Sequence, residues 1–476
     1  MCRHVGLVKR SISSLRIIWI ISLSLAVVSC KNDPFESRPN IVFILIDDMR
    51  WDTMSNVGHP FVRTPSIDRL ATEGVRFSNA FVTTSLCSPS RGSFMTGQYA
   101  HTHGVRVNNH MDPNPSAPMF PQLLQSAGYE SAFVGKWHMK PDPNPRPGFD
   151  YWLSFRGQGK YIDPELNENG KDFKAKGYMT DLLTDFAVEY LKKPKSKPFF
   201  LYLSHKGVHT PFTPAERHKD LYSLVDLQEP ANFHDDYSGK PEWYREAWLR
   251  GGRLNKPAPP DGIPGAVETR TWEPQQTRLD WYRALAAVDD SVGRLLDILD
   301  KLRLTDNTIV IFASDNGFFH GEHGRGDKRI AYEESIRIPL LIRLPGSQNR
   351  GEVISEMVLN IDVAPTILEL AGVNVPPSMQ GRSLLPLLDG ESTHWRTSFL
   401  YEYFKENWLP GIPTMTGVRT TRWKYIRYPE IDDIDELYDL EQDPYELHNL
   451  AEDPAAEDQL AKMRAELERL IKDSGY

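Results

Sequence analysis

Four short apolar runs in this chain each end in polar and ionisable residues, and this pattern limits the fold more than any other feature. The runs are rich in β-branched and aromatic residues and lie at residues 40–48, 129–138, 198–212 and 307–317. Amphipathic helical patterns lie between them, at residues 64–74, 179–193 and 279–302. Buried strands that alternate with helices predict an α/β fold, a large, mostly parallel or mixed sheet sandwiched by helices. Ligands bind at the carboxyl ends of the strands in such sheets.

A different pattern begins after residues 383–390 and predicts a smaller C-terminal subdomain. Strand-like runs at residues 398–404, 415–428 and 436–450 are expected to form a short antiparallel sheet, followed by a final helix at 455–473 with a solvated amphipathic face. We therefore expect a large α/β domain at residues 38–385 and an α+β subdomain at 386–476. Within the large domain, residues 215–278 are rich in Pro, Gly, Trp and charge. They predict a long surface excursion that walls a substrate cleft.

The N-terminal residues predict export. Basic residues precede an apolar run at residues 17–28 that ends in "SC", as in a secretory signal peptide, and the run is too short to span a bilayer. The ending "VVSC" resembles a bacterial lipobox. We expect residues 1–29 to be a lipoprotein-type signal peptide, Cys30 to carry a lipid anchor and residues 30–37 to form a tether. The predicted location is the outer membrane of a bacterium, periplasm-facing or at the cell surface. A plain signal peptide cleaved near Ser29 is the alternative.

Cysteine usage singles out Cys87. The chain has three cysteines; Cys2 leaves with the signal peptide and Cys30 is expected to be lipidated, so Cys87 has no partner for an intrachain disulfide. In an exported protein a leftover cysteine is reactive or modified. The formal net charge of −9 argues against a nucleic-acid partner.

Oxygen-bearing side chains follow two of the predicted strands. Asp47 and Asp48 end the first, and Asp315 and Asn316 end the last. Carboxylates gathered at one sheet edge repel one another unless a cation lies between them. A set without His or Cys favours a hard divalent ion, Ca²⁺ or alternatively Mg²⁺. For one isolated Asp, a turn or a helix cap is the competing interpretation.

The residues after Cys87 predict a helix that begins at this cysteine. Pro89 fits a first helical turn and Gly97 a helix end. A helix N-terminus stabilises negative charge, on a nucleophile or on an anionic substrate. Arg91, one turn later, is placed to hold either the nucleophile or the carboxylates. A buried structural cysteine is the alternative for Cys87 considered alone.

The segment "CSPSRGSFMTG" matches the signature C-x-P-S-R-x-x-x-[LM]-T-G of the type I sulfatases almost position for position. Further blocks follow in the order found in that family: "DD" after the first strand, "GKWH", "HTPF", "SDNG" and "GDKRIAYEESIRIPLLIRLPG". The chain thus resembles the formylglycine-dependent sulfatases of the alkaline phosphatase superfamily, of the bacterial polysaccharide type. The resemblance implies an alkaline-phosphatase-like fold and covers most of the mature chain.

This resemblance implies roles for residues in those blocks. A maturating, formylglycine-generating enzyme would oxidise Cys87 to formylglycine, and the hydrate of that aldehyde would attack sulfur. Calcium would be held by Asp47, Asp48, Asp315 and Asn316 together with the modified Cys87. Arg91 would balance charge, Lys136 and Lys328 would grip sulfate oxygens, His209 would protonate the leaving alcohol, and His138 would deprotonate the remaining hydroxyl to expel sulfate.

Several further residues are candidates for substrate contacts, with solvated loop positions as the competing interpretation. His320, His323 and Arg325 lie beside Lys328 in "FFHGEHGRGDK", and Tyr403, Trp408 and Arg422 lie in the smaller subdomain. His205 is a weaker catalytic candidate than His209, because His209 occupies the H-x-P position.

The resemblance implies a sulfuric ester hydrolase that acts on a sulfated glycan. Sulfated algal polysaccharide fragments such as ulvan and 6-sulfated N-acetylglucosamine glycans are both expected target classes. A phosphonate or phosphate ester hydrolase of the same superfamily is the first alternative, and a non-catalytic, lipid-anchored glycan-binding protein is the second.

Overall fold

The computed structural model describes residues 38–108, 111–249, 275–391 and 394–476. The predicted signal peptide, the tether and Cys30 lie outside these residues, so their prediction stays open. Within the described ranges, no helix combines the length and the apolar character that crossing a membrane requires.

The four predicted strands lie side by side at the centre of an eleven-stranded sheet. β1 (Asn40–Ile46) pairs in parallel with β7 (Phe199–Ser204) and with β8 (Thr308–Ser314). β3 (Glu130–Gly135) pairs in parallel with β7 on its other side. Because all four strands run in the same direction, the residues that follow them meet at one edge of the sheet.

The remaining strands make the sheet mixed. β11 (Arg337–Arg343) pairs antiparallel with β8 and with β2 (Val75–Phe81). The outer strands are β4 (Tyr151–Ser154), β5 (Glu165–Glu168), β6 (Lys171–Lys174), β12 (Glu352–Ile354) and β13 (Val358–Leu359). The predicted fold class, a large mixed sheet between helices, is confirmed.

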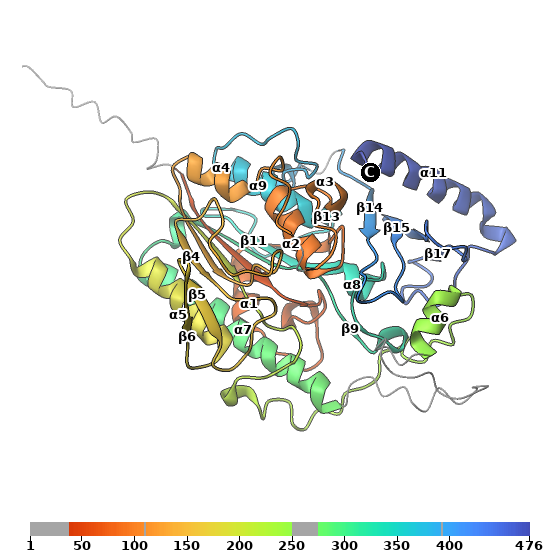
Figure 1. Cartoon of the computed structure of the whole chain (residues 1–476), viewed down its shortest axis with the longest axis horizontal. Coiled ribbons are helices and arrows are strands. Elements are labelled where there is room, and N and C mark those ends of the chain that lie inside the picture. Colours follow the sequence, from red (N-terminus) through yellow and green to blue (C-terminus); the bar gives the residue numbers. More distant parts are fainter. Residues whose placement is uncertain (1–37, 109–110, 250–274, 392–393) are drawn as a thin grey trace, which may run out of the picture.

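Helices cover both faces of this sheet (Figure 1). Ile41, Phe43 and Leu45 of β1 belong to one apolar core, whereas the alternate residues Val42, Ile44 and Ile46 belong to the other. Burying such a side chain contributes roughly 1.5–3 kcal/mol, so a strand buried on both faces anchors both helical layers. One layer contains α2 (Cys87–Thr96), α4 (Phe120–Ser126) and α9 (Val363–Leu370), and the other contains α1 (Pro65–Glu73), α5 (Met179–Lys192) and α7 (Gln275–Lys301).

The C-terminal residues form a separate four-stranded antiparallel sheet, as predicted. Its strands, in order, are β14 (Ser398–Tyr403), β15 (Met415–Thr420), β16 (Trp423–Arg427) and β17 (Glu436–Asp439). The final helix α11 (Glu457–Ser474) packs on β14, β15 and β16 through Leu460, Met463 and Leu467. The domain boundary after residue 385 stays a prediction; the short helix α10 (Leu385–Leu388) spans it and contacts α9.

The predicted surface excursion at residues 215–278 is only partly a surface segment. It contains η2 (Glu216–His218) and α6 (Glu242–Leu249), and its last residues begin α7. Lys240 and Tyr244 are fully buried, and Lys240 Nζ donates to the hydroxyls of Tyr332 at 2.9 Å and Tyr438 at 2.7 Å. The surface prediction was wrong for this part, because its aromatic residues and Lys240 pack between the large domain and the C-terminal sheet. Residues 250–274 lie outside the described ranges.

Gly135→Ala is expected to destabilise the fold at the end of β3. Gly135 has φ +126°, and a Cβ at this position would lie 1.8 Å from the carbonyl oxygen of Ser204 on β7. Left-handed strain and overpacking each cost about 1–3 kcal/mol, so the free energy of unfolding should fall by about 3 kcal/mol or more. Chemical denaturation measures this loss.

Gly346→Ala is the matched control. Gly346 also has a left-handed φ, +70°, but no atom lies within 4 Å of the Cβ position. Only the backbone strain of about 1–2 kcal/mol is expected there. Equal losses in the two variants would contradict the steric argument at Gly135.

Candidate active site

Three carboxylates and one amide meet at the carboxyl edge of the central strands. Asp47 and Asp48 follow β1, Asp315 and Asn316 follow β8, and all four side chains are buried. The backbone N–H of Asp48 donates to Asp315 Oδ1 at 3.1 Å, and one carboxylate oxygen from each aspartate lies within 4.8 Å of the others. The parallel pairing of β1 with β8 brings together residues that are 267 positions apart.

Three cations face these carboxylates. Arg91 donates to Asp315 Oδ2 through Nε at 2.9 Å, and its Nη2 lies 2.8 Å from the same oxygen. Lys136, which follows β3, bonds Asp47, and Lys328 bonds Asp48. Each charge is buried but paired, and removing one member of such a pair costs about 3–5 kcal/mol.

Burial and the surrounding charges shift the pKa values of Asp315 and Asp47 in opposite directions. Burial, with Asp47 adding to it, raises the pKa of Asp315 to about 7. Burial also favours protonation of Asp47, but Lys136, His209 and Arg91 outweigh it and hold the pKa of Asp47 well below its ordinary value. Crowded carboxylates of this kind are relieved by a bound cation.

The residues present fit a divalent cation. Asp48 Oδ2 and Asn316 Oδ1 are buried and accept no hydrogen bond from the described residues, so each oxygen has lone pairs available to a metal ion. A second, overlapping group consists of Asp47, Cys87 and His209. Burial raises the pKa of the Cys87 thiol to about 12. This second group mixes a carboxylate with a thiol and an imidazole, which suit softer ions. The all-oxygen set of Asp47, Asp48, Asp315 and Asn316 is therefore the better metal site, and its donors suit a hard ion.

Cys87 begins α2, as the sequence predicts, and the helix ends at Gly97 in a left-handed conformation. Its Sγ lies 3.0 Å from Lys328 Nζ and 3.6 Å from Asp47 Oδ1. The next backbone N–H, that of Ser88, donates to Asn108 Oδ1 at 2.9 Å. Cys87 is thus held at a helix N-terminus, between the carboxylate cluster and a buried cation.

His209 lies against the same cluster. Its Nδ1 is 2.8 Å from the carbonyl oxygen of Thr210, and because a carbonyl only accepts, Nδ1 carries a proton. The other ring nitrogen, Nε2, lies 3.8 Å from Asp48 Oδ2. Burial, reinforced by Lys136, holds the pKa of His209 well below its ordinary value. His205 points elsewhere and bonds Ser291 Oγ of α7 at 2.9 Å.

His138 lies beside Cys87 in a strained backbone conformation. Its φ is +62°, which a non-glycine residue rarely adopts, and its carbonyl oxygen accepts a 2.6 Å bond from Ser88 Oγ. Its Nδ1 is buried and has no hydrogen-bond partner among the described residues. Strain of this kind is maintained where the surrounding structure fixes a functional side chain. The roles of these histidines in a reaction stay predictions.

Most of the predicted substrate contacts have partners within the protein. His320 stacks on Tyr282 at 5.4 Å, and His323 bonds Asp235 at 2.7 Å. Arg325 lies over Tyr244, and Arg422 pairs with Asp439 at the end of β17. Tyr403 is buried, whereas Trp408 is exposed. A substrate role for these residues stays a prediction; Trp408 is 63% exposed, and the Arg422 side chain is 43% exposed.

Sequence reasoning missed Lys206, which is buried next to the cluster. Its Nζ donates to the carbonyl oxygen of Thr210 at 3.2 Å and lies 4.6 Å from the Tyr161 ring. Burial, with Lys136 adding to it, lowers its pKa to about 8. Its position directly after β7 was the available signal, because it shares that strand end with His209.

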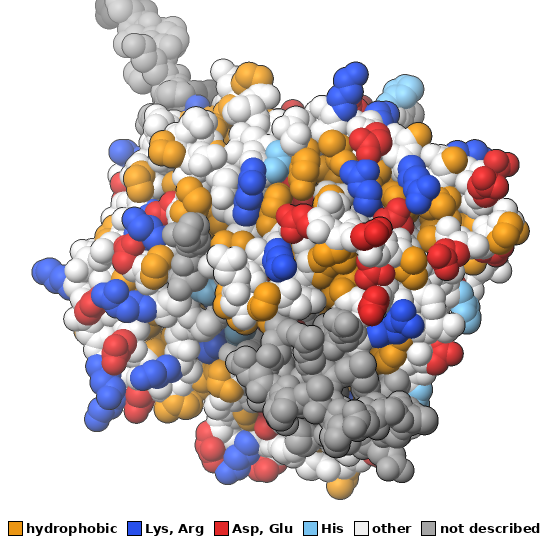
Figure 2. Space-filling view, turned by 45° about the vertical axis from the view of Figure 1, so that its right-hand side comes forward, with side chains coloured by type: hydrophobic (Ala, Val, Ile, Leu, Met, Phe, Trp, Pro, Cys, Tyr) orange, Lys and Arg blue, Asp and Glu red, His pale blue; other side chains and the backbone are white. Residues whose placement is uncertain are grey.

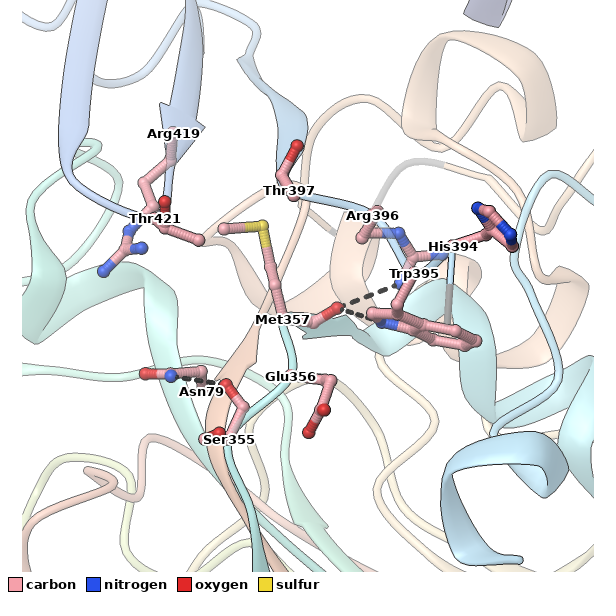
Figure 3. A pocket seen from close by; sticks show the side chains of 10 residues that line it. All are labelled: Asn79, Ser355, Glu356, Met357, His394, Trp395, Arg396, Thr397, Arg419 and Thr421. Carbon is pink, nitrogen blue, oxygen red and sulfur yellow. Dashed lines mark hydrogen bonds between the residues drawn. The ribbon is translucent and has the colours of Figure 1, made fainter. Parts of the chain in front are cut away.

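A cavity of about 450 Å³ lies elsewhere, between the edge of the large sheet and the C-terminal sheet (Figure 3). Its arginines are already engaged: Arg396 with Asp362 and Arg419 with Glu333. None of the candidate catalytic residues lines it. On the face shown in Figure 2, the described residues carry acidic and basic side chains intermixed with apolar ones, and they form no patch of one sign.

Two family models match the chain. The sulfatase model matches residues 39–373, and a model of the C-terminal part of N-sulphoglucosamine sulphohydrolase matches residues 321–473. The chain is 35% identical to the N-acetylglucosamine-6-O-sulfatase of Bacteroides thetaiotaomicron, over 99% of this chain and 92% of the relative. It is 28% identical to the ulvan-active sulfatase of Formosa agariphila, over 98% of this chain and 89% of that protein.

A solved structure of a complex with the substrate D-glucosamine-2-N,6-O-disulfate is also similar. It superposes with a TM-score of 0.83 at 34% identity, over 92% of this chain and 98% of that chain.

Proposed function

This chain belongs to the sulfatase family, and from that premise we propose that it removes the 6-O-sulfate of sulfated N-acetylglucosamine units in glycan fragments. At the coarser level it is a sulfuric ester hydrolase that acts on a sulfated glycan. The finer assignment draws on the relative that acts on N-acetylglucosamine 6-sulfate and on the similar complex with a 6-O-sulfated glucosamine.

The observation that carries this function is the buried set around Cys87. A carboxylate cluster, two lysines and two histidines gather where the parallel strands end, and Cys87 lies between Lys328 and Asp47. An ionised sulfate ester needs cations for its oxygens, a nucleophile for sulfur and an acid for the leaving oxygen. Each of these groups is present within this cluster.

We propose that Cys87 is oxidised to formylglycine by a maturating enzyme. The hydrated aldehyde supplies a hydroxyl nucleophile toward sulfur and an escape route that regenerates the aldehyde. The protonated thiol of the unmodified residue is a weak nucleophile by comparison. Lys328, which contacts Cys87 Sγ, and Lys136 then hold the sulfate oxygens.

The two histidines move protons in this proposal. The bond from Nδ1 of His209 to the carbonyl of Thr210 fixes the ring and directs Nε2 into the site. Nε2 carries no proton while the ring is neutral, and it gains one when the negative charge of the bound sulfate ester raises the low pKa of His209. That proton is donated to the sugar oxygen as its bond to sulfur breaks, which releases a neutral alcohol. His138, whose carbonyl oxygen accepts from Ser88 Oγ next to Cys87, removes the proton of the remaining hydroxyl on the sulfated hydrate. Loss of this proton expels sulfate and restores the aldehyde.

Calcium is the proposed metal and Mg²⁺ is the alternative, held by Asp47, Asp48, Asp315 and Asn316. Bound there, a divalent ion supplies positive charge next to the nucleophile. Without it, the charges of Arg91, Lys136 and Lys328 are offset by the three carboxylates. With it, the site becomes net positive and attracts an anionic sulfate ester.

We also propose that the protein is an exported bacterial lipoprotein anchored through Cys30 at the outer membrane. The support is the basic and apolar N-terminal sequence and its "VVSC" ending. Membrane fractionation of the native protein and of Cys30→Ser tests the anchor. Release of the variant into the soluble fraction is expected, and equal membrane retention of both would contradict lipidation.

A substrate panel tests the proposed function. Purified, matured enzyme is given N-acetylglucosamine 6-sulfate, sulfated ulvan oligosaccharides, an aryl sulfate and an aryl phosphate, and the released anion is quantified. The highest kcat/KM is expected on N-acetylglucosamine 6-sulfate. Faster release from ulvan fragments would change the proposed sugar, and dominant phosphate release would favour the phosphonate or phosphate ester hydrolase alternative.

A further inference from the structure

Among the tryptophans whose side chains the structure describes, Trp408 has the largest exposed fraction. It is 63% exposed and lies in the segment between β14 and β15. An indole ring that stays exposed to water has an unfavourable hydration free energy, because most of its surface is apolar. Such exposed rings are enriched where proteins bind other molecules. The described contacts of Trp408 show how it is held.

Buried charged residues fix the Trp408 ring from one side. Its Nε1 donates to Glu406 Oε1 at 3.0 Å, and the guanidinium of Arg329 lies over the ring, 5.1 Å from its centroid. Arg329 Nε in turn donates to Glu406 Oε2 at 2.7 Å, and both partners are buried. Since Arg329 covers one face, the exposed area belongs mainly to the other face and the ring edge. The ring is therefore preorganised before any ligand binds.

The same contacts tie Trp408 to the active site. Arg329 directly follows Lys328, whose Nζ lies 3.0 Å from Cys87 Sγ. On the other side of the segment, Arg106 lies over the Phe404 ring at 4.9 Å, and two residues after it Asn108 accepts from the Ser88 N–H at the start of α2. The segment 404–408 thus contacts both loops that flank Cys87.

We propose that the outward face of Trp408 stacks on the pyranose ring whose sulfate ester is bound at Cys87, which makes Trp408 a specificity-determining residue. This inference rests on the proposed function. The C–H face of a pyranose is apolar and matches an indole face in size, and a rigid tryptophan loses little entropy when it binds. Asp327, directly before Lys328, pairs with Arg329, and its side chain is 54% exposed, so its carboxylate also has lone pairs to offer to ring hydroxyls.

Kinetics on N-acetylglucosamine 6-sulfate test the stacking. Trp408→Ala is expected to raise KM about tenfold with kcat changed less than about threefold, because stacking holds the substrate and the transition state alike. Trp408→Phe keeps an aromatic face and should retain most of the affinity. Tyr445→Ala is the matched control: Tyr445 is 49% exposed and lies beyond β17, at the opposite edge of the C-terminal sheet, and its loss should leave both constants unchanged.

A binding measurement without turnover separates the possible failures. In the Cys87→Ala background, titration calorimetry with N-acetylglucosamine 6-sulfate should give a Kd about tenfold higher when Trp408→Ala is added. Unchanged Kd and KM in Trp408→Ala, on an enzyme active toward this sugar, would overturn the stacking alone. A wild-type enzyme that cleaves the aryl sulfate but not this sugar would overturn the proposed function and the sugar named here.

Discussion

Cys87→Ala is expected to abolish sulfate release, with a loss of about ten-thousand-fold or more, while the protein remains folded. Alanine removes the atom from which formylglycine is made and hence the nucleophile, and loss of a nucleophile in comparable enzymes costs this much or more. Cys87 is fully buried at the start of a helix whose ten residues are all buried. Truncating its thiol should still cost only about 1 kcal/mol of stability.

Steady-state sulfate release and thermal unfolding of wild type and Cys87→Ala measure the two effects. Mass spectrometry of the Cys87 peptide from the native host gives the direct control, and formylglycine is expected in place of the thiol. Appreciable activity in Cys87→Ala would contradict the nucleophile assignment. An unmodified thiol in an inactive native protein would favour the non-catalytic glycan-binding alternative.

Removal of the divalent cation is the second change with a large expected effect. Dialysis against a chelator should lower kcat/KM at least about hundredfold, because a preorganised charge beside the nucleophile is lost from a dry site. The buried Asp48 Oδ2 and Asn316 Oδ1 would also lose their partner. Adding Ca²⁺ back should restore activity.

Thermal stability gives a readout of metal binding that does not depend on catalysis. A cation at one hundred times its Kd stabilises the folded state by about 2.7 kcal/mol, so the Tm of the metal-free protein should rise with added Ca²⁺. Chelator presaturated with Ca²⁺ is the control and should change nothing. Full activity in protein shown by elemental analysis to lack metal would contradict the cation site, and better restoration by Mg²⁺ would identify that ion instead.

Much of the candidate site follows from the order of strands and motifs along the chain. Asp47, Lys136, His209 and Asp315 each come directly or shortly after a strand that the apolar pattern predicts. Parallel strands in one sheet have their carboxyl ends at the same edge, so residues in these positions converge whatever their separation in sequence. The start of α2 at Cys87 and its end at Gly97 follow equally from local chemistry.

The irregular segments were not predictable in this way. Lys328 lies in a loop with left-handed residues such as Asp327 and Arg329, and no periodicity shows which of its side chains turn inward. In the same loop His323 bonds Asp235 of the excursion, and Arg325 lies over Tyr244. These partners are more than 80 residues apart, and their pairing depends on burial and charge in the folded protein.

The sequence by itself therefore determined the α/β sheet, the carboxylate cluster of Asp47, Asp48 and Asp315 and the cysteine at a helix N-terminus, because strand periodicity and local helix signals act over a few residues. The tertiary structure alone decided that Lys240 is buried, that Lys328 contacts Cys87, and that Trp408 stays exposed on Arg329 and Glu406. Such contacts between irregular segments depend on which distant side chains meet when the two sheets pack, and this information is not periodic along the chain.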